Sequence, residues 1–437
     1  MKNISKLVLF SAISVLSFAC GKDDDDNNNT PPVTEVVTLE NTLSEDMTLT
    51  KDKKYLLKGF VYVPAGKTLT IEPGTIIKGD KDSKGTLIVE RGGKLIADGT
   101  ASDPIVFTSN MPAGQRSVGD WGGIILLGKA PVNLPGGTGA IEGGVDRMYG
   151  GTEPNDNSGV LRYVRLEFSG IAFQPDNEIN GLTMGGVGAG TTLDYIQVSY
   201  NGDDSFEWFG GTVNAKHLVA YHNVDDMFDT DAGYSGTVQY ALGISNPDVA
   251  DVSKSNGFES DNDGAGSGNT PLTSPKFVNV SLYGPMATTG STVNANYGRG
   301  LHIRRNSQLQ LHNSVVAGWP TGLLLDSEGT QNGAMVKNTV IAGATDALKA
   351  ASPATFDVAN WFNTTMTGNQ IMTNNADLQV PNAYATTGRS FAPATGSPLL
   401  SGGVAVAGAE ANTFRGAIGQ TDWTQGWTNW DPQNTPY

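Results

Sequence analysis

The chain has 437 residues, a formal net charge of −16, only 16% charged residues and 56 glycines. High glycine with low charge excludes helical bundles and coiled coils, and the lack of a Gly-x-y period excludes collagen. The negative charge argues against nucleic acid as a partner and suits the collection of divalent cations. This composition favours an all-β fold with many tight turns.

Residues 1–19 have the organisation of a secretory signal peptide. Lys2 and Lys6 precede an apolar run, residues 7–19, which is too short to span a bilayer as a mature helix. The run ends before Cys20, and because this is the only cysteine, no disulfide can form within the chain. The arrangement resembles a bacterial lipobox, which implies that Cys20 carries the lipid that anchors the protein to the membrane.

Residues 20–35 are predicted to form a disordered tether. They contain four consecutive aspartates, 23–26, followed by asparagines and prolines, and such a segment cannot form a core. The acidic run resembles the export signal of Bacteroidota lipoproteins. That resemblance implies an outer-membrane location with the protein facing the cell exterior.

Residues 36–389 consist of short apolar runs separated by Gly, Pro, Asn and Asp, which is the pattern of short strands joined by tight turns. Residues 201–207 and 223–229 carry similar sequences 22 residues apart, and residues 163–170 resemble residues 195–202 with an offset of 32. A period of about 22 residues predicts one coil of a parallel β-helix, whereas propeller blades need about 40. We expect one inward ladder of Ile196, Leu218 and Tyr240 and another of Val198, Ala220 and Leu242.

Residues 390–437 differ from the repeats and contain Trp423, Trp427 and Trp430. A solenoid needs a cap over its last open coil. We therefore expect a C-terminal capping segment that folds back on the body, with the tryptophans packed in it.

Several motifs together resemble one family. They are Leu-Thr-Ile-Glu-Pro-Gly-Thr at residues 69–75, Gly-Asp-Trp-Gly-Gly-Ile at residues 119–124, the paired Asp-Asp repeats and the Gly-Ser-Pro-Leu tail. They are similar to Bacteroidota surface lipoproteins with a pectin-lyase-like fold, whose functions are mostly undetermined. The resemblance covers nearly all of the mature chain and implies a right-handed parallel β-helix solenoid. The wider superfamily includes polysaccharide lyases, glycoside hydrolases, esterases and adhesins.

Carboxylates are concentrated in equivalent turns of two adjacent coils. Coils stack about 4.8 Å apart, so Asp203 should lie over Asp225 and Asp204 over Asp226. Three interpretations remain open: a Ca²⁺ site built from hard oxygens, a glycosidase-like acid/base pair, or structural capping of turns. The Gly-His-Gly and Arg-x-Lys motifs of polygalacturonase-type hydrolases are absent. The candidate metal ligands are Asp203, Asp204, Glu207, Asp225, Asp226, Asp229 and Asp231.

Arg299, His302, Arg304 and Arg305 form a basic cluster. Superfamily lyases use Ca²⁺ to neutralise a uronate carboxylate and an Arg or Lys to abstract a proton, a role open to Arg299, Arg304 or Arg305 only where they face the acidic cluster. Strand alternation places His302 and Arg304 on one face. The catalytic candidates are therefore Asp203, Asp225 and Arg304.

Without a complete catalytic motif, the sequence favours a cell-surface lipoprotein that binds an extended glycan or a surface protein, with Ca²⁺ as its candidate cofactor. A Ca²⁺-dependent polysaccharide lyase or glycoside hydrolase is the first alternative. An accessory subunit of an outer-membrane barrel complex is the second. A cleft shared by Asp203, Asp225, Asp229 and Arg304 would favour the enzyme.

Overall fold

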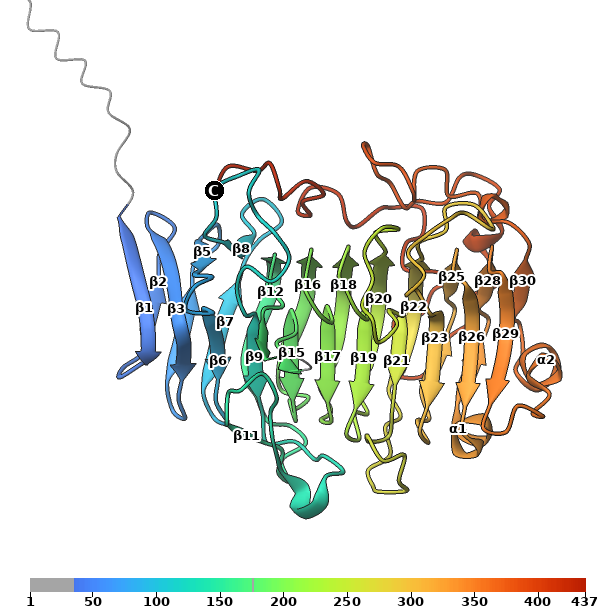
Figure 1. Cartoon of the computed structure of the whole chain (residues 1–437), viewed down its shortest axis with the longest axis horizontal. Helices are drawn as coiled ribbons and strands as arrows, with labels where there is room; N and C mark the ends of the chain where they lie inside the picture. The colour runs from blue at the N-terminus through green and yellow to red at the C-terminus, as the bar shows by residue number, and fades with distance from the viewer. Residues whose placement is uncertain (1–34, 175–176) are drawn as a thin grey trace, which may run out of the picture. The chain divides into compact units, whose positions relative to one another are not determined.

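Short strands stack in parallel along one axis in the computed structural model, which describes residues 35–174 and 177–437 (Figure 1). Twenty-six of the strands belong to one continuous sheet. The strand pairings divide this sheet into three faces, and each coil of the chain visits the three faces in turn. The predicted parallel β-helix is confirmed. The predicted signal peptide, Cys20 and the acidic run lie outside the described residues.

The three faces are named here in the order in which the chain visits them. The first face comprises the second halves of β1 (Val36–Thr42) and β3 (Lys54–Val63), then β6 (Thr86–Val89), β9 (Ile124–Leu127), β15 (Leu182–Gly185), β17 (Phe206–Phe209), β19 (Phe228–Asp231), β21 (Phe258–Ser260), β23 (Arg299–Arg304), β26 (Thr321–Asp326) and β29 (Asp346–Ala351).

The second face comprises β2 (Met47–Leu49), β4 (Thr68–Ile71), β7 (Lys94–Asp98), the first halves of β12 (Gly159–Glu167), β16 (Thr192–Ser199), β18 (Ala215–Tyr221), β20 (Thr237–Ile244) and β22 (Lys276–Tyr283), then β24 (Gln310–His312) and β27 (Met335–Lys337). The third face comprises the first halves of β1 and β3, then β5 (Ile76–Gly79), β8 (Ile105–Ser109), the second halves of β12, β16, β18, β20 and β22, and β25 (Val315–Ala317), β28 (Val340–Ala342) and β30 (Gln370–Met372).

Two short antiparallel hairpins interrupt the coils, and a few short helical turns accompany them. The hairpins pair β10 (Gly139–Ala140) with β11 (Met148–Tyr149), and β13 (Ala172–Gln174) with β14 (Asn177–Glu178). The helical elements are α1 (Glu328–Gly333), α2 (Val358–Asn360), the π-helical turn η2 (Trp361–Thr365) and the 3₁₀ turns η1 (Pro135–Gly137), η3 (Asn375–Leu378) and η4 (Pro398–Leu400). No helix within the described ranges is long and apolar enough to cross a membrane.

The strand register confirms the 22-residue coil, but one predicted ladder position is wrong in each ladder. Ile196 lies beside Leu218, as expected, but Leu218 lies beside Ala241 rather than Tyr240. Ala220 likewise lies beside Gly243 rather than Leu242. The reason is that the segment between Asp231 and Val238 is one residue longer than the segment between Phe209 and Ala215.

Tyr240 instead belongs to a column of rings at the bend between the second and third faces. Tyr163, Tyr195, His217 and Tyr240 all have positive φ and lie in stacked pairs with ring centroids 4.4, 4.1 and 5.0 Å apart. The left-handed conformation is costly for a side-chain-bearing residue, so the stacking of the rings and the sheet around them must hold it.

The C-terminal segment, residues 390–437, runs back along the solenoid (Figure 1). Asn313 donates a hydrogen bond to the Val404 carbonyl at 2.8 Å, while Trp423 and Trp427 pack edge-on against Tyr195. The segment thus folds back on the body, and it lies along a flank of the coils.

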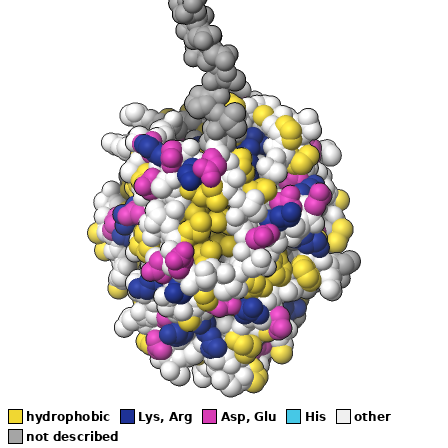
Figure 2. Space-filling model, turned by 90° about the vertical axis from the view of Figure 1, so that its left-hand side faces the viewer, with side chains coloured by type: hydrophobic (Ala, Val, Ile, Leu, Met, Phe, Trp, Pro, Cys, Tyr) yellow, Lys and Arg dark blue, Asp and Glu magenta, His cyan; other side chains and the backbone are white. Residues whose placement is uncertain are grey.

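The two ends of the solenoid differ. At the C-terminal end, Trp361 and Phe362 of η2 are buried against the core. At the N-terminal end, Val36 of β1 is 60% exposed, and Figure 2 shows hydrophobic side chains in the middle of this face with charged ones around them. Aromatic side chains of η2 therefore cover the core at the C-terminal end.

Candidate cation-binding pocket

The acidic residues gather where the chain passes from the third face to the first. Asp203 and Asp204 lie in the turn before β17, and the following coil has Asp225 and Asp226 at the same place before β19. Outward positions on the strands continue the cluster, because their neighbours Phe206, Phe228 and Phe258 point inward and pack against one another in the core. The paired outward residues are Glu207, Asp229 and Glu259.

These residues line a pocket of about 530 Å³. Asp203, Asp225, Asp229 and Arg304 all line it. These four residues therefore share a cleft, which is the arrangement that would favour an enzyme. Asp231, the seventh candidate ligand, is not among the lining residues. The lining side chains that carry charge are ten carboxylates, Glu142, Glu178, Asp203, Asp204, Glu207, Asp225, Asp226, Asp229, Asp251 and Glu259, and two cations, Lys254 and Arg304.

Several wall residues come from segments that the repeat did not predict. Glu142 lies in the insertion between β9 and β12, and Glu178 lies in the β13–β14 hairpin. Asp251 and Lys254 lie in the long connection between β20 and β21. The sequence signal for them is indirect, since each insertion breaks the 22-residue period next to the acidic turns.

Two of the aspartates hold the backbone of the next coil. Oδ1 of Asp204 accepts a hydrogen bond from the Asp226 N–H at 2.8 Å, and Oδ1 of Asp226 accepts one from the Asn256 N–H. The side chain of Asn223 donates to the carbonyls of Asp225 and Asp226. Turn capping therefore accounts for one oxygen each of Asp204 and Asp226.

Other oxygens in the cluster are buried without a donor. Oδ1 of Asp225 and Oδ1 of Asp229 have no hydrogen-bond partner among the described residues, although Ser253 donates to Oδ2 of Asp225 at 2.8 Å. Asn180 is 1% exposed, and its Oδ1 also lacks a partner while its Nδ2 donates to Glu142 and Glu207. A buried polar oxygen without a partner is costly, so a ligand that satisfies these oxygens would stabilise the pocket.

Burial and mutual repulsion disfavour the charged forms of these carboxyl groups. Burial, followed by the charge of Asp225, raises the pKa of Asp203 well above its usual value. Burial raises the pKa of Asp225 to about 7. Burial and the neighbouring carboxylates similarly raise the pKa values of Asp204, Glu207, Asp226 and Asp229. At neutral pH the cluster therefore needs either protons or cations to compensate its charge.

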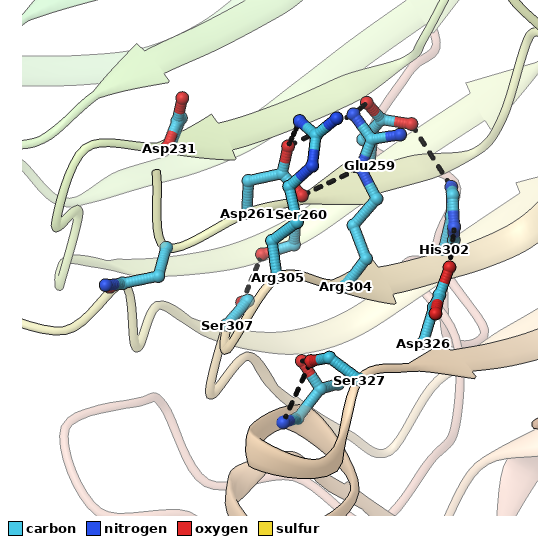
Figure 3. Close-up of polar contacts among 12 residues, drawn as sticks. Asp231, Glu259, Ser260, Asp261, His302, Arg304, Arg305, Ser307, Asp326 and Ser327 are labelled. Atoms are coloured by element: carbon cyan, nitrogen blue, oxygen red, sulfur yellow. Dashed lines mark hydrogen bonds and ion pairs between the residues drawn. The ribbon is translucent and has the colours of Figure 1, made fainter. Parts of the chain in front are cut away.

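At one end of the pocket, Arg304 already compensates part of the acidic charge (Figure 3). Its guanidinium pairs with Glu259 and makes two hydrogen bonds to Asp261, at 2.8 and 3.1 Å. His302 lies on the same strand face, as predicted, with Nδ1 3.2 Å from Glu259. Burial alone would raise the pKa of Glu259, but His302 and Arg304 lower it below its usual value.

The same ion pairs determine the protonation state of Arg304. Burial alone would lower the pKa of Arg304, but the hydrogen bonds to Asp261 and the charge of Glu259 raise it. Arg305 also pairs with Asp261, at 2.8 Å. Arg304 is thus held as a protonated cation between two carboxylates, which does not suit a base that must abstract a proton.

The arrangement fits Ca²⁺. Three groups of carboxylates each place three oxygens within 4.8 Å of one another: Asp203, Asp204 and Asp225; Asp204, Glu207 and Asp229; and Asp226, Asp229 and Glu259. Ca²⁺–oxygen distances of 2.3–2.6 Å allow two ligands of one ion to lie up to about 5.2 Å apart. Asp225 and Asp229, which each carry a buried oxygen without a donor, belong to these groups.

Together the fold and the pocket define a parallel β-helix with a carboxylate-rich pocket on its flank. The family model for the pectate-lyase-like β-helix domain matches residues 41–428, and the chain belongs to this family. Comparison with curated proteins and with solved structures found no match.

Proposed function

We propose that this protein is a cell-surface β-helix lipoprotein that binds Ca²⁺ in the acidic pocket and, with it, an extended glycan. The observation that carries the proposal is the set of three carboxylate groups with their unpartnered oxygens. Oxygen ligands of this kind are those that Ca²⁺ prefers. When bound, Ca²⁺ supplies a positive centre that sugar hydroxyl or carboxylate oxygens can ligate.

The size and walls of the pocket support a glycan as the ligand. A volume of about 530 Å³ exceeds what cations alone require and lies within the range of small-molecule sites. Carboxylates and the Asn180 amide offer hydrogen-bond partners for sugar hydroxyls. The stacked coils also extend along one axis beside the pocket, which suits a linear polymer.

Binding of purified polysaccharides, measured by calorimetry with Ca²⁺ and again with EDTA, tests this function. We expect a neutral or acidic glycan that binds in Ca²⁺ and is lost in EDTA. Asp225→Asn should abolish binding, and Asp231→Asn should retain it, because Asp231 carries the same charge on β19 without lining the pocket. Glycan binding unaffected by both EDTA and Asp225→Asn would refute the proposal.

An enzyme is the second candidate, because Asp203, Asp225 and Asp229 share one pocket with Arg304. The ion pairs of Arg304 disfavour a lyase that uses this residue as its base. A glycoside hydrolase with a carboxyl pair, such as Asp203 and Asp225, is the form of enzyme that does not need Arg304 as a base. Polymer cleavage that Asp203→Ala or Asp225→Ala abolishes would replace the binding function with this one.

The location at the outer membrane is a proposal that rests on Cys20 and on the acidic run 23–26. We expect the native protein to incorporate labelled fatty acid and a Cys20→Ala variant to lose it. Protease added to intact cells should degrade the native protein. Protection from the protease in intact cells, with degradation after lysis, would contradict an exterior location.

A further inference from the structure

The three carboxylate groups of the pocket are linked by shared residues. The first group is Asp203, Asp204 and Asp225, and the second is Asp204, Glu207 and Asp229. The third group shares Asp229 with the second and adds Asp226 and Glu259. The number of cations that the pocket holds therefore depends on which groups can be filled together. The inference drawn from this rests on the proposed function.

The third group already has its cation. Arg304 pairs with Glu259, and His302 lies 3.2 Å from the same carboxylate on the other oxygen. The side chain of Glu259 is 17% exposed and that of Arg304 is 23% exposed, so this pair is largely shielded from water. A divalent ion in the third group would have to displace a protein cation, which the first and second groups do not require.

The first and second groups each include a residue with a buried carboxylate oxygen that lacks a donor. Asp225, whose Oδ1 lacks a donor, belongs to the first group, and Asp229, whose Oδ1 lacks a donor, belongs to the second and third. Beside the second group, Asn180 is 1% exposed, and its unpartnered Oδ1 belongs to a side chain that lines the pocket. The amide nitrogen of Asn180 donates to Glu207, which holds this side chain against the group. These oxygens point to a ligand in each of the two groups.

From these contacts we infer that the pocket holds two divalent cations at once, one in the first group and one in the second, with the carboxylate of Asp204 shared between them. The Asp226 N–H holds Oδ1 of Asp204 at 2.8 Å, so the shared carboxylate is fixed in place before any cation binds. Two such ions about 4 Å apart require strong negative charge around them. The five carboxylates of the two groups supply it, where one Ca²⁺ would leave most of that charge uncompensated.

Counting the bound ions tests the inference. In equilibrium dialysis of Ca²⁺ against the metal-free protein, we expect two ions per chain. Asp225→Asn should remove one ion and leave the other, and Asp229→Asn should do the same for the opposite site. Asp204→Asn should weaken both sites by tenfold or more. Asp231→Asn is the matched control and should still bind two, and circular dichroism of each variant checks that it is folded.

Whether the two ions lie close together can be measured independently. With Mn²⁺ as the probe, the spectrum at two ions per chain should show broadening from spin–spin coupling, because two ions that share a carboxylate lie close together. Two uncoupled Mn²⁺ ions would overturn the shared ligand. One Ca²⁺ per chain would overturn the two-ion site while leaving the proposed function intact. No bound Ca²⁺ would overturn both.

Discussion

The backbone N–H of Asp226 donates a hydrogen bond of 2.8 Å to the carboxylate of Asp204, which lies one coil earlier. An acidic side chain thus takes part in the hydrogen bonding between two adjacent coils. Asp204 also belongs to two of the carboxylate groups. A cation bound by either group would therefore contact the residue that links the two coils. Cation binding and the stability of the central coils should therefore be coupled.

Calcium should raise the thermal stability of the protein. A ligand that binds the native state at 100 times its dissociation constant stabilises it by about 2.7 kcal/mol. With an unfolding entropy of about 2.1 cal/mol/K per residue, that corresponds to a rise of roughly 3 °C in Tm for the described domain. Scanning calorimetry with Ca²⁺ and then with excess EDTA measures the shift. An unchanged Tm at millimolar Ca²⁺ would count against the cation site.

The pH dependence of this effect follows from the raised pKa of Asp225. Its pKa is about 7 in the folded protein, against about 3.9 in the unfolded chain. The stability that its proton contributes is fully present below about pH 4 and is lost as the pH rises through about 7. The metal-free protein should therefore lose this contribution in that range, and Ca²⁺ should restore more stability at pH 8 than at pH 5.

Calorimetry of Ca²⁺ binding checks the same linkage directly. In buffers with different ionisation enthalpies, Ca²⁺ binding near pH 6 should release protons, since cation and proton compete for the same oxygens. Asp225→Asn should reduce the number of protons released. Comparing the variant with the native protein removes the contribution of His222 and His312, whose pKa values burial lowers to about 3 and about 4. Equal proton release in both proteins would assign the protons to other groups.

The coil architecture could be predicted from the sequence because each coil repeats the same local pattern. The match between residues 201–207 and 223–229 placed Asp203 and Asp204 near Asp225 and Asp226 without any knowledge of the turns between them. The pattern failed at Tyr240, where one additional residue shifted the register. A shift of one residue along the strand moves a side chain from an inward position to the left-handed bend. Both positions accommodate an aromatic side chain, so the repeat pattern does not distinguish them.

The pocket walls could not be predicted in the same way. Glu142, Glu178 and Asp251 come from insertions that have no counterpart in the neighbouring coils, so no periodicity places them. The ion pairs of Arg304 could not be predicted from the sequence either. Strand alternation predicted its face, but its partner Asp261 is the residue after the end of β21, just beyond the paired positions. Interactions between side chains of different coils depend on rotamers that a repeat pattern does not specify.

The aromatic turn at the C-terminal end should be required for stability. Phe362 is fully buried against the core, whereas Phe356 in the same region is only partly buried. Replacing a buried Phe with Ala costs about 3–5 kcal/mol. Phe362→Ala should therefore lower the free energy of unfolding in urea by this amount, and Phe356→Ala should lower it much less. Similar losses for the two variants would mean that Phe362 does not seal the last coil.

The C-terminal segment should depend in part on a buried contact of its last residue. The hydroxyl of Tyr437 donates a 2.6 Å hydrogen bond to Oε1 of Glu167, a residue with no exposed surface. Arg116 lies over the Tyr437 ring at 4.9 Å and donates to the Pro432 and Thr435 carbonyls, which holds the segment against the coils. Tyr437→Phe leaves a buried carboxyl oxygen without its donor, at a cost of about 1–3 kcal/mol.

A double-mutant cycle isolates that contact. Tyr437→Phe should lower the free energy of unfolding and speed proteolysis within residues 420–437. Its cost should be smaller in a Glu167→Gln background, because the charged acceptor is already gone there. Burial raises the pKa of Glu167, whereas Arg165 and the hydrogen bond from Tyr437 lower it, so Glu167 should titrate at a higher pH in Tyr437→Phe than in the native protein. Equal costs in both backgrounds would show that the hydroxyl contributes through packing rather than through Glu167.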